Sequence, residues 1–209
     1  MNFLAHTYLS GSSDEILVGN FIGDYVKGRY FSNYPEEIRQ GIIMHRNIDN
    51  YTDTHPIVKQ TKLHFSEKYG KYAGIVVDII YDHYLAKFWH LYSDIQLDEF
   101  IFNLHKKLSS FYPIFPPKVK EFFPKFIKNN WIKAYTSLEG LERVLIGMSR
   151  TTSLPNETNF AMQSLILNYD IIGEEFNAYF PQLVNFIAKN FNVKFEEDYG
   201  MGQINAQAS

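Results

Sequence analysis

Apolar residues recur at intervals of three and four along most of the chain, and no stretch alternates convincingly between apolar and polar residues. This spacing is typical of amphipathic helices, whereas alternation would indicate strands. Helices are therefore predicted over residues 12–28, 35–52, 56–70, 74–91, 97–111, 136–149 and 156–191. Pro181 is a point at which the last helix can bend, and residues 112–133, with four prolines, are expected to break into short helices and turns.

The pattern predicts an all-α protein of seven or eight helices. Its 209 residues, 45% of them hydrophobic, are enough to build one compact domain with a sizeable core. We assign residues 1–197 to this domain and residues 198–209 to a flexible polar tail.

The amino-acid composition restricts the chemistry that the chain can perform. It contains no cysteine, which excludes disulfides, thiolate metal sites and cysteine nucleophiles, so any metal must be held by His, Asp or Glu. No apolar run approaches the roughly 18 residues that a membrane helix requires, and the N-terminal residues carry no basic leader. We therefore expect a cytoplasmic protein that does not bind a membrane.

Charge is distributed unevenly along the chain, whose formal net charge is −3. Residues 104–135 hold seven lysines and one acidic residue, while the first hundred residues hold thirteen acidic and nine basic ones. In KVKEFFPKFIKNNWIKAY, residues 118–135, lysines are interleaved with aromatic residues, which suits a docking face for an acidic partner. Solvated lysines over an ordinary aromatic core are the alternative interpretation. Nucleic acid is not expected as a partner, because the chain is acidic and lacks a base-reading motif.

The helix predicted over residues 35–52 changes character along one face. Its stripe begins with Ile38 and Ile42 and continues with His45, Asp49 and Asp53 at intervals of four residues. Ionisable residues are rarely buried without partners. Either these three side chains lie solvated at the edge of the stripe, or they form one wall of a functional site.

Two further predicted helices carry acids on apolar faces. Asp78 and Asp82 lie four residues apart in VVDIIYDHYLAKFW, where like charges repel each other unless a cation lies beside them. His83 adds a nitrogen ligand next to Asp82, and Asp24 lies in GNFIGDYVKG. Oxygen and nitrogen donors from several helices are typical of metal sites inside helical bundles. Scattered structural ion pairs are the alternative interpretation.

Five stretches carry these residues in order along the chain. They are MNFLAH (1–6), GNFIGDYVKG (19–28), GIIMHRNIDNYTD (41–53), VVDIIYDHYLAKFW (76–89) and RVLIGMS (143–149). Together they resemble the acyl carrier protein phosphodiesterases, also called holo-acyl carrier protein hydrolases. The resemblance covers the chain from Met1 to about Phe191, and five motifs in register are far more specific than any one of them.

The resemblance implies an HD-like helical bundle that removes 4′-phosphopantetheine from the serine of holo-acyl carrier protein with a divalent metal, Mn²⁺ or Mg²⁺. Candidate metal ligands, in the matching motifs, are Asp24, His45, Asp49, Asp82 and His83. The remaining polar positions, taken as catalytic, are His6, Arg46, Asp53 and Asp78. Candidate substrate-binding residues are Asn20, Lys27 and Arg46, together with the docking lysines Lys118, Lys120 and Lys125.

In this scheme a bound metal activates water and neutralises charge on the phosphate. Arg46 can clamp a phosphate oxygen, and His6 or His83 can protonate the departing serine oxygen. HD enzymes generally use a His, an adjacent His-Asp pair and an Asp in that order, whereas here Asp82 precedes His83. Two other functions stay open: an HD-like phosphohydrolase acting on a nucleotide or another small phosphodiester, and a non-catalytic helical module that binds a carrier protein.

Overall fold

The computed structural model describes residues 2–195, and this part of the chain is all-α, which confirms the predicted fold class. Its α-helices are α1 (Phe3–Leu9), α2 (Asp14–Ile22), α3 (Glu36–Thr54), α4 (Pro56–Tyr69), α5 (Ala73–Lys87), α6 (Leu97–Ser110), α7 (Pro117–Lys128), α8 (Trp131–Ala134), α9 (Leu138–Thr151), α10 (Thr158–Leu167) and α11 (Tyr169–Phe191). Short 3-10 helices connect several of them. The predicted tail from residue 198 lies outside the described residues.

The helices outnumber the seven or eight that were predicted, for two reasons. The short helices α1 and α8 have too few residues to show a periodic pattern, and the predicted helix over 156–191 is divided into α10 and α11. The division falls at Asn168, whose backbone N–H bonds to the carbonyl oxygen of Ser164. Pro181 lies inside α11 and does not end it, because the burial of neighbouring Phe180 and Leu183 offsets the missing hydrogen bond.

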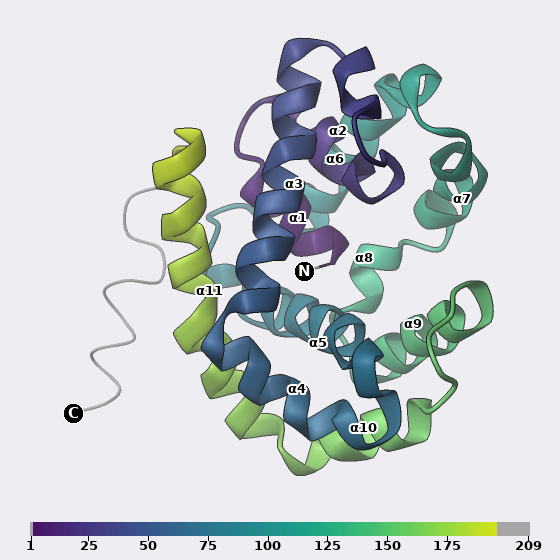
Figure 1. The fold of residues 1–209 in the computed structure, drawn as a ribbon, viewed down its shortest axis with the longest axis vertical. Helices are drawn as coiled ribbons and strands as arrows, with labels where there is room; N and C mark the ends of the chain where they lie inside the picture. Colours follow the sequence, from purple (N-terminus) through teal and green to yellow (C-terminus); the bar gives the residue numbers. More distant parts are fainter. Residues whose placement is uncertain (1, 196–209) are drawn as a thin grey trace.

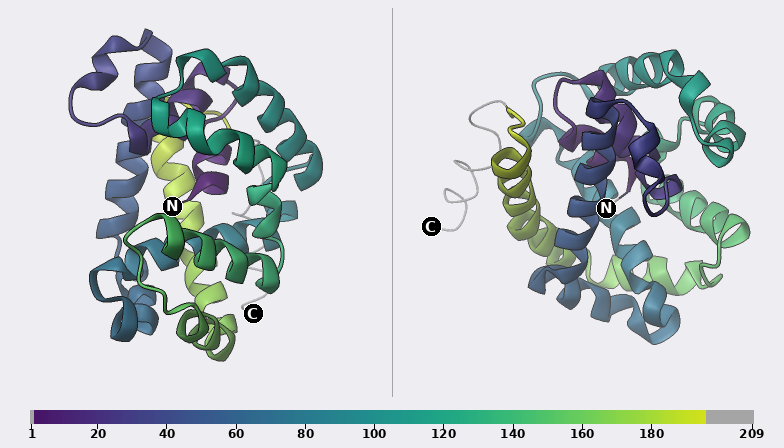
Figure 2. Two further views of the ribbon diagram at one scale, coloured as in Figure 1. Left: turned by 90° about the vertical axis from the view of Figure 1, so that its right-hand side faces the viewer. Right: turned by 45° about the horizontal axis from the view of Figure 1, so that its top comes forward.

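Figure 1 shows α1 near the centre of the molecule, with α3 running past it. α11 flanks one side, and α7, α8 and α9 form the other (Figures 1 and 2). Contacts join α1 to α2 and α5, and they join α3 to α2, α4 and α11. The first helix is thus surrounded by longer ones, and most of its side chains are buried.

The closest helix packing is between α2 and α3, and it depends on two glycines. A Cβ atom added to Gly19 would lie 2.1 Å from the carbonyl oxygen of Ile38, and one added to Gly41 would lie 2.2 Å from that of Ile16. The two backbones therefore touch directly at these positions. This crossing places the end of α2 against the middle of α3.

The buried apolar side chains form one cluster that extends from Leu4 to Ile187. Among them lie several buried polar residues, including His6, Asn20, His45, Asp82 and His83. Buried polar groups require partners, so their hydrogen bonds locate the candidate site. Within residues 2–195, no helix combines the length and the apolar character needed to cross a membrane.

Candidate metal centre

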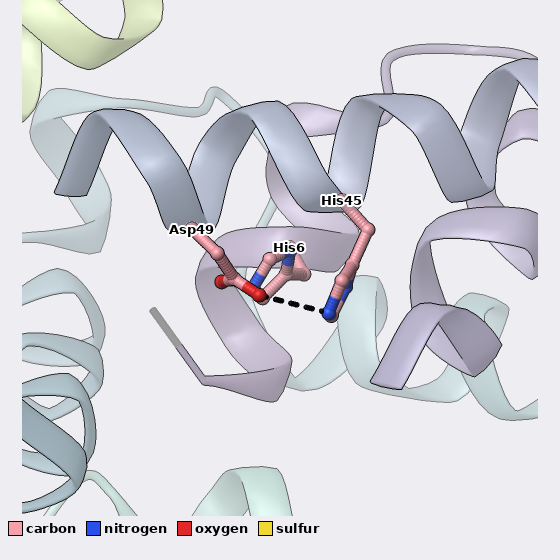
Figure 3. Close-up of side chains that lie close together, drawn as sticks. All are labelled: His6, His45 and Asp49. Carbon is pink, nitrogen blue, oxygen red and sulfur yellow. Dashed lines mark ion pairs between the residues drawn. The ribbon is translucent and has the colours of Figure 1, made fainter. Parts of the chain in front are cut away.

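Two histidines and one aspartate meet between α1 and α3. His6 belongs to α1, while His45 and Asp49 lie one turn apart on α3. Figure 3 shows the three side chains close together, and one ligand atom of each lies within 4.8 Å of the others. Nε2 of His6 is 3.2 Å from Oδ1 of Asp49, and Nε2 of His45 is 3.1 Å from Oδ2 of the same carboxylate.

The ring of His6 is oriented by Asn20, which is fully buried. Nδ2 of Asn20 donates to the backbone oxygen of His6 at 2.8 Å and to Oγ of Ser10 at 3.0 Å. Oδ1 of Asn20 is therefore the acceptor that lies 2.8 Å from Nδ1 of His6. With its proton on Nδ1, His6 turns the lone pair of Nε2 toward Asp49.

The ring of His45 is held by a backbone group. Its Nδ1 donates to the carbonyl oxygen of Asn20 at 2.9 Å, so Nε2 again faces carboxylates. These are Asp49 and Asp24, whose Oδ1 lies 3.3 Å from Nε2. Gly23 leaves space for the ring, because a Cβ atom at that position would lie 2.3 Å from Cγ of His45.

The two histidines differ in their ionisation. Burial lowers the pKa of His6 to about 4, which leaves the ring neutral at neutral pH. Burial also acts to lower the pKa of His45, but the carboxylates of Asp24 and Asp49 outweigh it and raise this pKa to about 9. Against the effect of burial, both histidines hold the pKa of Asp49 far below its usual range. The cluster therefore favours a cation at Nε2 of His45.

The donor set fits a divalent metal ion. Nε2 of His6 and Nε2 of His45 are buried and form no hydrogen bond of good geometry, although carboxylate oxygens lie 3.1 to 3.3 Å away. At neutral His6 the lone pair of Nε2 faces an oxygen of Asp49, and such opposed lone pairs repel each other unless a cation separates them. Ligating histidines in metal sites usually donate their second N–H to an oxygen, as both rings do here. His6, His45 and Asp49, with Asp24 beside them, form the candidate ligand set.

A cavity of about 280 Å³ opens beside this cluster and is lined by Asp24, Asp49, Asp53 and Asp78. Burial raises the pKa of Asp78. Asp53 forms an ion pair with Lys62, whose Nζ lies 2.8 Å from Oδ1. Lys62 was missed in the sequence, because nothing in its local pattern on α4 distinguishes it from the other lysines of this helix. This space, called the aspartate cavity below, adjoins the cluster through Asp24 and Asp49.

Asp82, a predicted ligand, is not brought into the cluster. Its two oxygens accept the backbone N–H groups of Leu4 and Ala5 at 2.8 and 3.1 Å. Asp82 is therefore a cap for the N-terminus of α1. Burial raises its pKa to about 7, although these two hydrogen bonds act in the opposite direction.

His83, the other ligand predicted on α5, is also outside the cluster. Its Nδ1 lies 2.7 Å from the carbonyl oxygen of Tyr135, and its Nε2 lies 2.7 Å from the hydroxyl of Tyr169. Both nitrogens already have protein partners. The adjacent acid and histidine that suggested a ligand pair instead connect α5 to three other parts of the fold.

Arg46 and Asn20 were predicted to bind substrate, and both are engaged within the protein. Nη2 of Arg46 donates to the carbonyl oxygens of Val26 and Gly28, each at 2.9 Å, and the guanidinium lies over the ring of Phe31. Arg46 therefore fixes the loop that follows Asp24. Asn20 is likewise engaged, since its buried amide orients His6 and donates to Ser10.

The predicted docking lysines lie on or near the surface of α7. Lys118 and Lys125 are exposed, while Nζ of Lys120 donates to the carbonyl oxygen of Pro113. The aromatic residues Phe123 and Phe126 between them are buried. The interleaved pattern thus separates into an aromatic interior and a lysine surface.

Lys27, also predicted to bind substrate, is exposed on the loop after α2. It lines an open groove of about 590 Å³ between this loop and the start of α7, together with Tyr34 and Pro117. The groove does not share lining residues with the aspartate cavity. Lys27 is therefore placed on the same side as the docking lysines and outside the candidate metal centre.

Comparison with known proteins identifies the family. Residues 1–183 match the family model described as acyl carrier protein phosphodiesterase. A protein of that name from Enterobacter sp. (strain 638) is 31% identical over 185 residues, which cover 88% of this chain and 96% of the relative. Another, from Klebsiella pneumoniae (strain 342), is 32% identical over 191 residues, covering 91% and 98%. No solved structure matches. The extent of these matches shows that the chain belongs to the acyl carrier protein phosphodiesterase family.

Proposed function

We propose that the protein is a metal-dependent phosphodiesterase that removes 4′-phosphopantetheine from the serine of holo-acyl carrier protein, giving apo-acyl carrier protein. The observation that carries this proposal is the cluster of His6, His45 and Asp49, whose buried ring nitrogens face carboxylates beside the aspartate cavity. Family membership suggests the substrate class, because the curated relatives are named for it.

His6, His45 and Asp49 would hold the metal, with Asp24 as a further donor. When bound, the metal would supply an activated water and neutralise charge on the phosphate oxygens. Two imidazole ligands favour Mn²⁺ over Mg²⁺, because Mg²⁺ prefers oxygen donors. In this proposal Asp82 and His83 support the fold and are not ligands.

The departing serine oxygen needs a proton, and Asp78 is the proposed donor. It lines the aspartate cavity, and burial raises its pKa, so it keeps a proton at a higher pH than an exposed aspartate does. The water loses one proton to solvent as its oxygen bonds to phosphorus, and the bond between phosphorus and the serine oxygen breaks. The serine oxygen takes the proton of Asp78, which regains one from solvent. Lys62, held by Asp53, is the proposed partner of a phosphate oxygen, because Nη2 of Arg46 already donates to backbone carbonyl oxygens.

The lysine surface of α7 is the proposed docking face for the carrier protein. Lys118 and Lys125 are exposed and lie two helical turns apart on a part of the chain that carries excess positive charge. Complementary charge accelerates encounter with an acidic protein and weakens as salt rises. Lys120 contributes its charge while also bonding to the loop before α7.

The test is mass spectrometry of holo-acyl carrier protein incubated with the purified protein and Mn²⁺. Loss of the 4′-phosphopantetheine mass is expected, and a chelator or Asp49→Asn should stop it. Lys59→Glu, an exposed change on α4, is a control that should leave the rate unchanged. Unmodified holo-acyl carrier protein in the presence of metal-loaded enzyme would refute the activity. Equal hydrolysis of small nucleotide diesters would favour the phosphohydrolase alternative, and absence of metal binding would favour the binding module.

A further inference from the structure

A second cavity lies beside the aspartate cavity and has a different character. It measures about 460 Å³ and is lined by residues of α1, α8 and α9. Small-molecule pockets typically occupy roughly 300–1,000 Å³, so this one is large enough for a ligand. Asn2 and Met148 line both cavities, so the two spaces adjoin at these residues.

The walls of the second cavity are mainly apolar, with polar groups at a few positions. Phe3, Trp131 and Val144 supply apolar surface, while Asn129 and Arg143 supply amide and guanidinium groups. The ring of Trp131 is held in place by aromatic neighbours and stacks on Phe122 with an interplanar angle of 11°. The cavity is therefore suited to a ligand that alternates apolar and amide segments.

The second cavity gives a position to one of the five sequence motifs. RVLIGMS, residues 143–149, contributes no side chain to the metal cluster, but Arg143, Val144, Gly147 and Met148 all line the second cavity. They lie on one face of α9, at helical spacings of one, three and four residues. This face is turned toward α8 and the start of α1 across the cavity.

We propose that this cavity, called the arm pocket below, binds the pantetheine arm of the substrate while the phosphate lies in the aspartate cavity. The inference rests on the proposed function and deepens it. Pantetheine carries a dimethyl group, two amides and a thiol on one flexible chain. Its apolar segments match Trp131 and Val144, and its amides match the hydrogen-bonding groups of Asn129 and Arg143. The pocket would explain a preference for phosphopantetheine over other phosphodiesters.

Gly147 provides a direct way to fill the arm pocket. A Cβ atom at this position meets no heavy atom within 4 Å, so larger side chains can be added without a clash at the backbone. Gly147 also lies inside α9, where replacement of glycine improves helix propensity by up to about 1 kcal/mol. Gly147→Leu and Gly147→Phe should therefore fold. Ile166→Phe, at an exposed position of α10, is the control for an added surface ring.

The kinetic test compares these variants on holo-acyl carrier protein. Gly147→Phe is expected to raise KM by about tenfold, with a smaller rise for Gly147→Leu, while Mn²⁺ binding stays unchanged. Ile166→Phe should behave as the wild type. A wild-type KM for Gly147→Phe would overturn the arm pocket.

A binding test does not depend on catalysis. The chain has two tryptophans, and Trp131 lines the arm pocket whereas Trp89 is buried elsewhere. Titration with pantetheine should change the tryptophan emission of the wild type in a saturable manner, and both Gly147→Phe and Trp131→Phe should abolish the change. No change in the wild type would overturn the inference. Saturable binding without release of 4′-phosphopantetheine would support the arm pocket and refute the proposed reaction.

Discussion

Two regions of the molecule contain an aspartate and a histidine side by side, and the structure gives them opposite roles. In the cluster between α1 and α3, Nε2 of His6 and Nε2 of His45 lack well-formed hydrogen bonds and face carboxylate oxygens. On α5, Asp82 and His83 already bond to protein groups through both oxygens and both nitrogens. The first region therefore fits the metal site that we propose, while in the second region these atoms already have protein partners.

The difference shows that residue type does not decide which polar groups can act as ligands. A metal ligand needs a lone pair that the fold positions but does not use. Asn20 creates this condition for His6 and His45, because its side-chain and backbone oxygens accept hydrogen bonds from Nδ1 of each ring, on the side away from the carboxylates. Tyr169 removes it for His83 by occupying the second nitrogen.

The largest effect on activity is expected when one histidine of each region is replaced by alanine and the two variants are compared. His45→Ala is expected to lower kcat/KM for holo-acyl carrier protein at least about a thousandfold, because a metal ion contributes several kcal/mol to catalysis. His83→Ala should lower it by less than about tenfold, since this ring has no role in the cluster. Initial rates at saturating Mn²⁺ measure both, and equal losses of kcat/KM would contradict the different roles assigned to His45 and His83.

Asp82→Ala tests the structural role of the second region. The change leaves the N–H groups of Leu4 and Ala5 without their acceptor inside the core. The unfolding free energy of the metal-free protein should fall by about 2–5 kcal/mol, as expected for two buried unpaired donors. Asp49→Asn should cost less, because the Asp49 carboxylate is 37% exposed. Chemical denaturation measures both losses of unfolding free energy. A larger loss for Asp49→Asn than for Asp82→Ala would contradict the structural role of Asp82.

Asn20→Ala should weaken the metal site without removing a ligand. The ring of His6 would lose its Oδ1 acceptor, and loss of such an orienting partner typically costs about 10–100-fold in metal affinity. Calorimetric titration with Mn²⁺ measures this effect. His83→Gln is the matched change in the second region and should leave Mn²⁺ affinity at the wild-type value.

The lysine surface extends the comparison to the substrate. Lys118→Glu combined with Lys125→Glu is expected to raise KM for holo-acyl carrier protein about tenfold at low salt, with kcat little changed. The difference should shrink as salt rises, because both side chains are exposed and screened. Lys59→Glu combined with Lys71→Glu makes the same charge change away from α7. An equal effect of this control pair would show that only net charge matters.

The pH dependence of stability provides a further test of the second region. Burial raises the pKa of Asp82 from its ordinary value of 3.8 to about 7, so the folded protein binds this proton more strongly than the unfolded chain does. The unfolding free energy should therefore decline as the pH rises from about 4 to about 7. Asp82→Asn should remove this part of the slope. Denaturation curves recorded across that range give the unfolding free energy at each pH. The same dependence on pH in the wild type and in Asp82→Asn would contradict the raised pKa of Asp82.

The sequence predicts the helices and much of the candidate site, because both depend on local periodicity. The stripe on residues 35–52 correctly placed His45 and Asp49 on one face, and GNFIGDYVKG brought Asp24 beside them. The hydrogen bonds of Asp82 could not be predicted, because the N–H groups that it accepts lie 77 and 78 residues away, in a helix too short to show a pattern. The pairing of Asp53 with Lys62 depends in the same way on how α3 and α4 pack.

In the proposed metal site, His6, His45 and Asp49 hold the metal, and Asp82 and His83 do not. Anomalous diffraction from crystals soaked in Mn²⁺, collected near the manganese absorption edge, tests it most directly. We expect a peak within bonding distance of Nε2 of His6, Nε2 of His45 and a carboxylate oxygen of Asp49. A peak beside Asp82 and His83, or none at the cluster in Mn²⁺-loaded active enzyme, would contradict it.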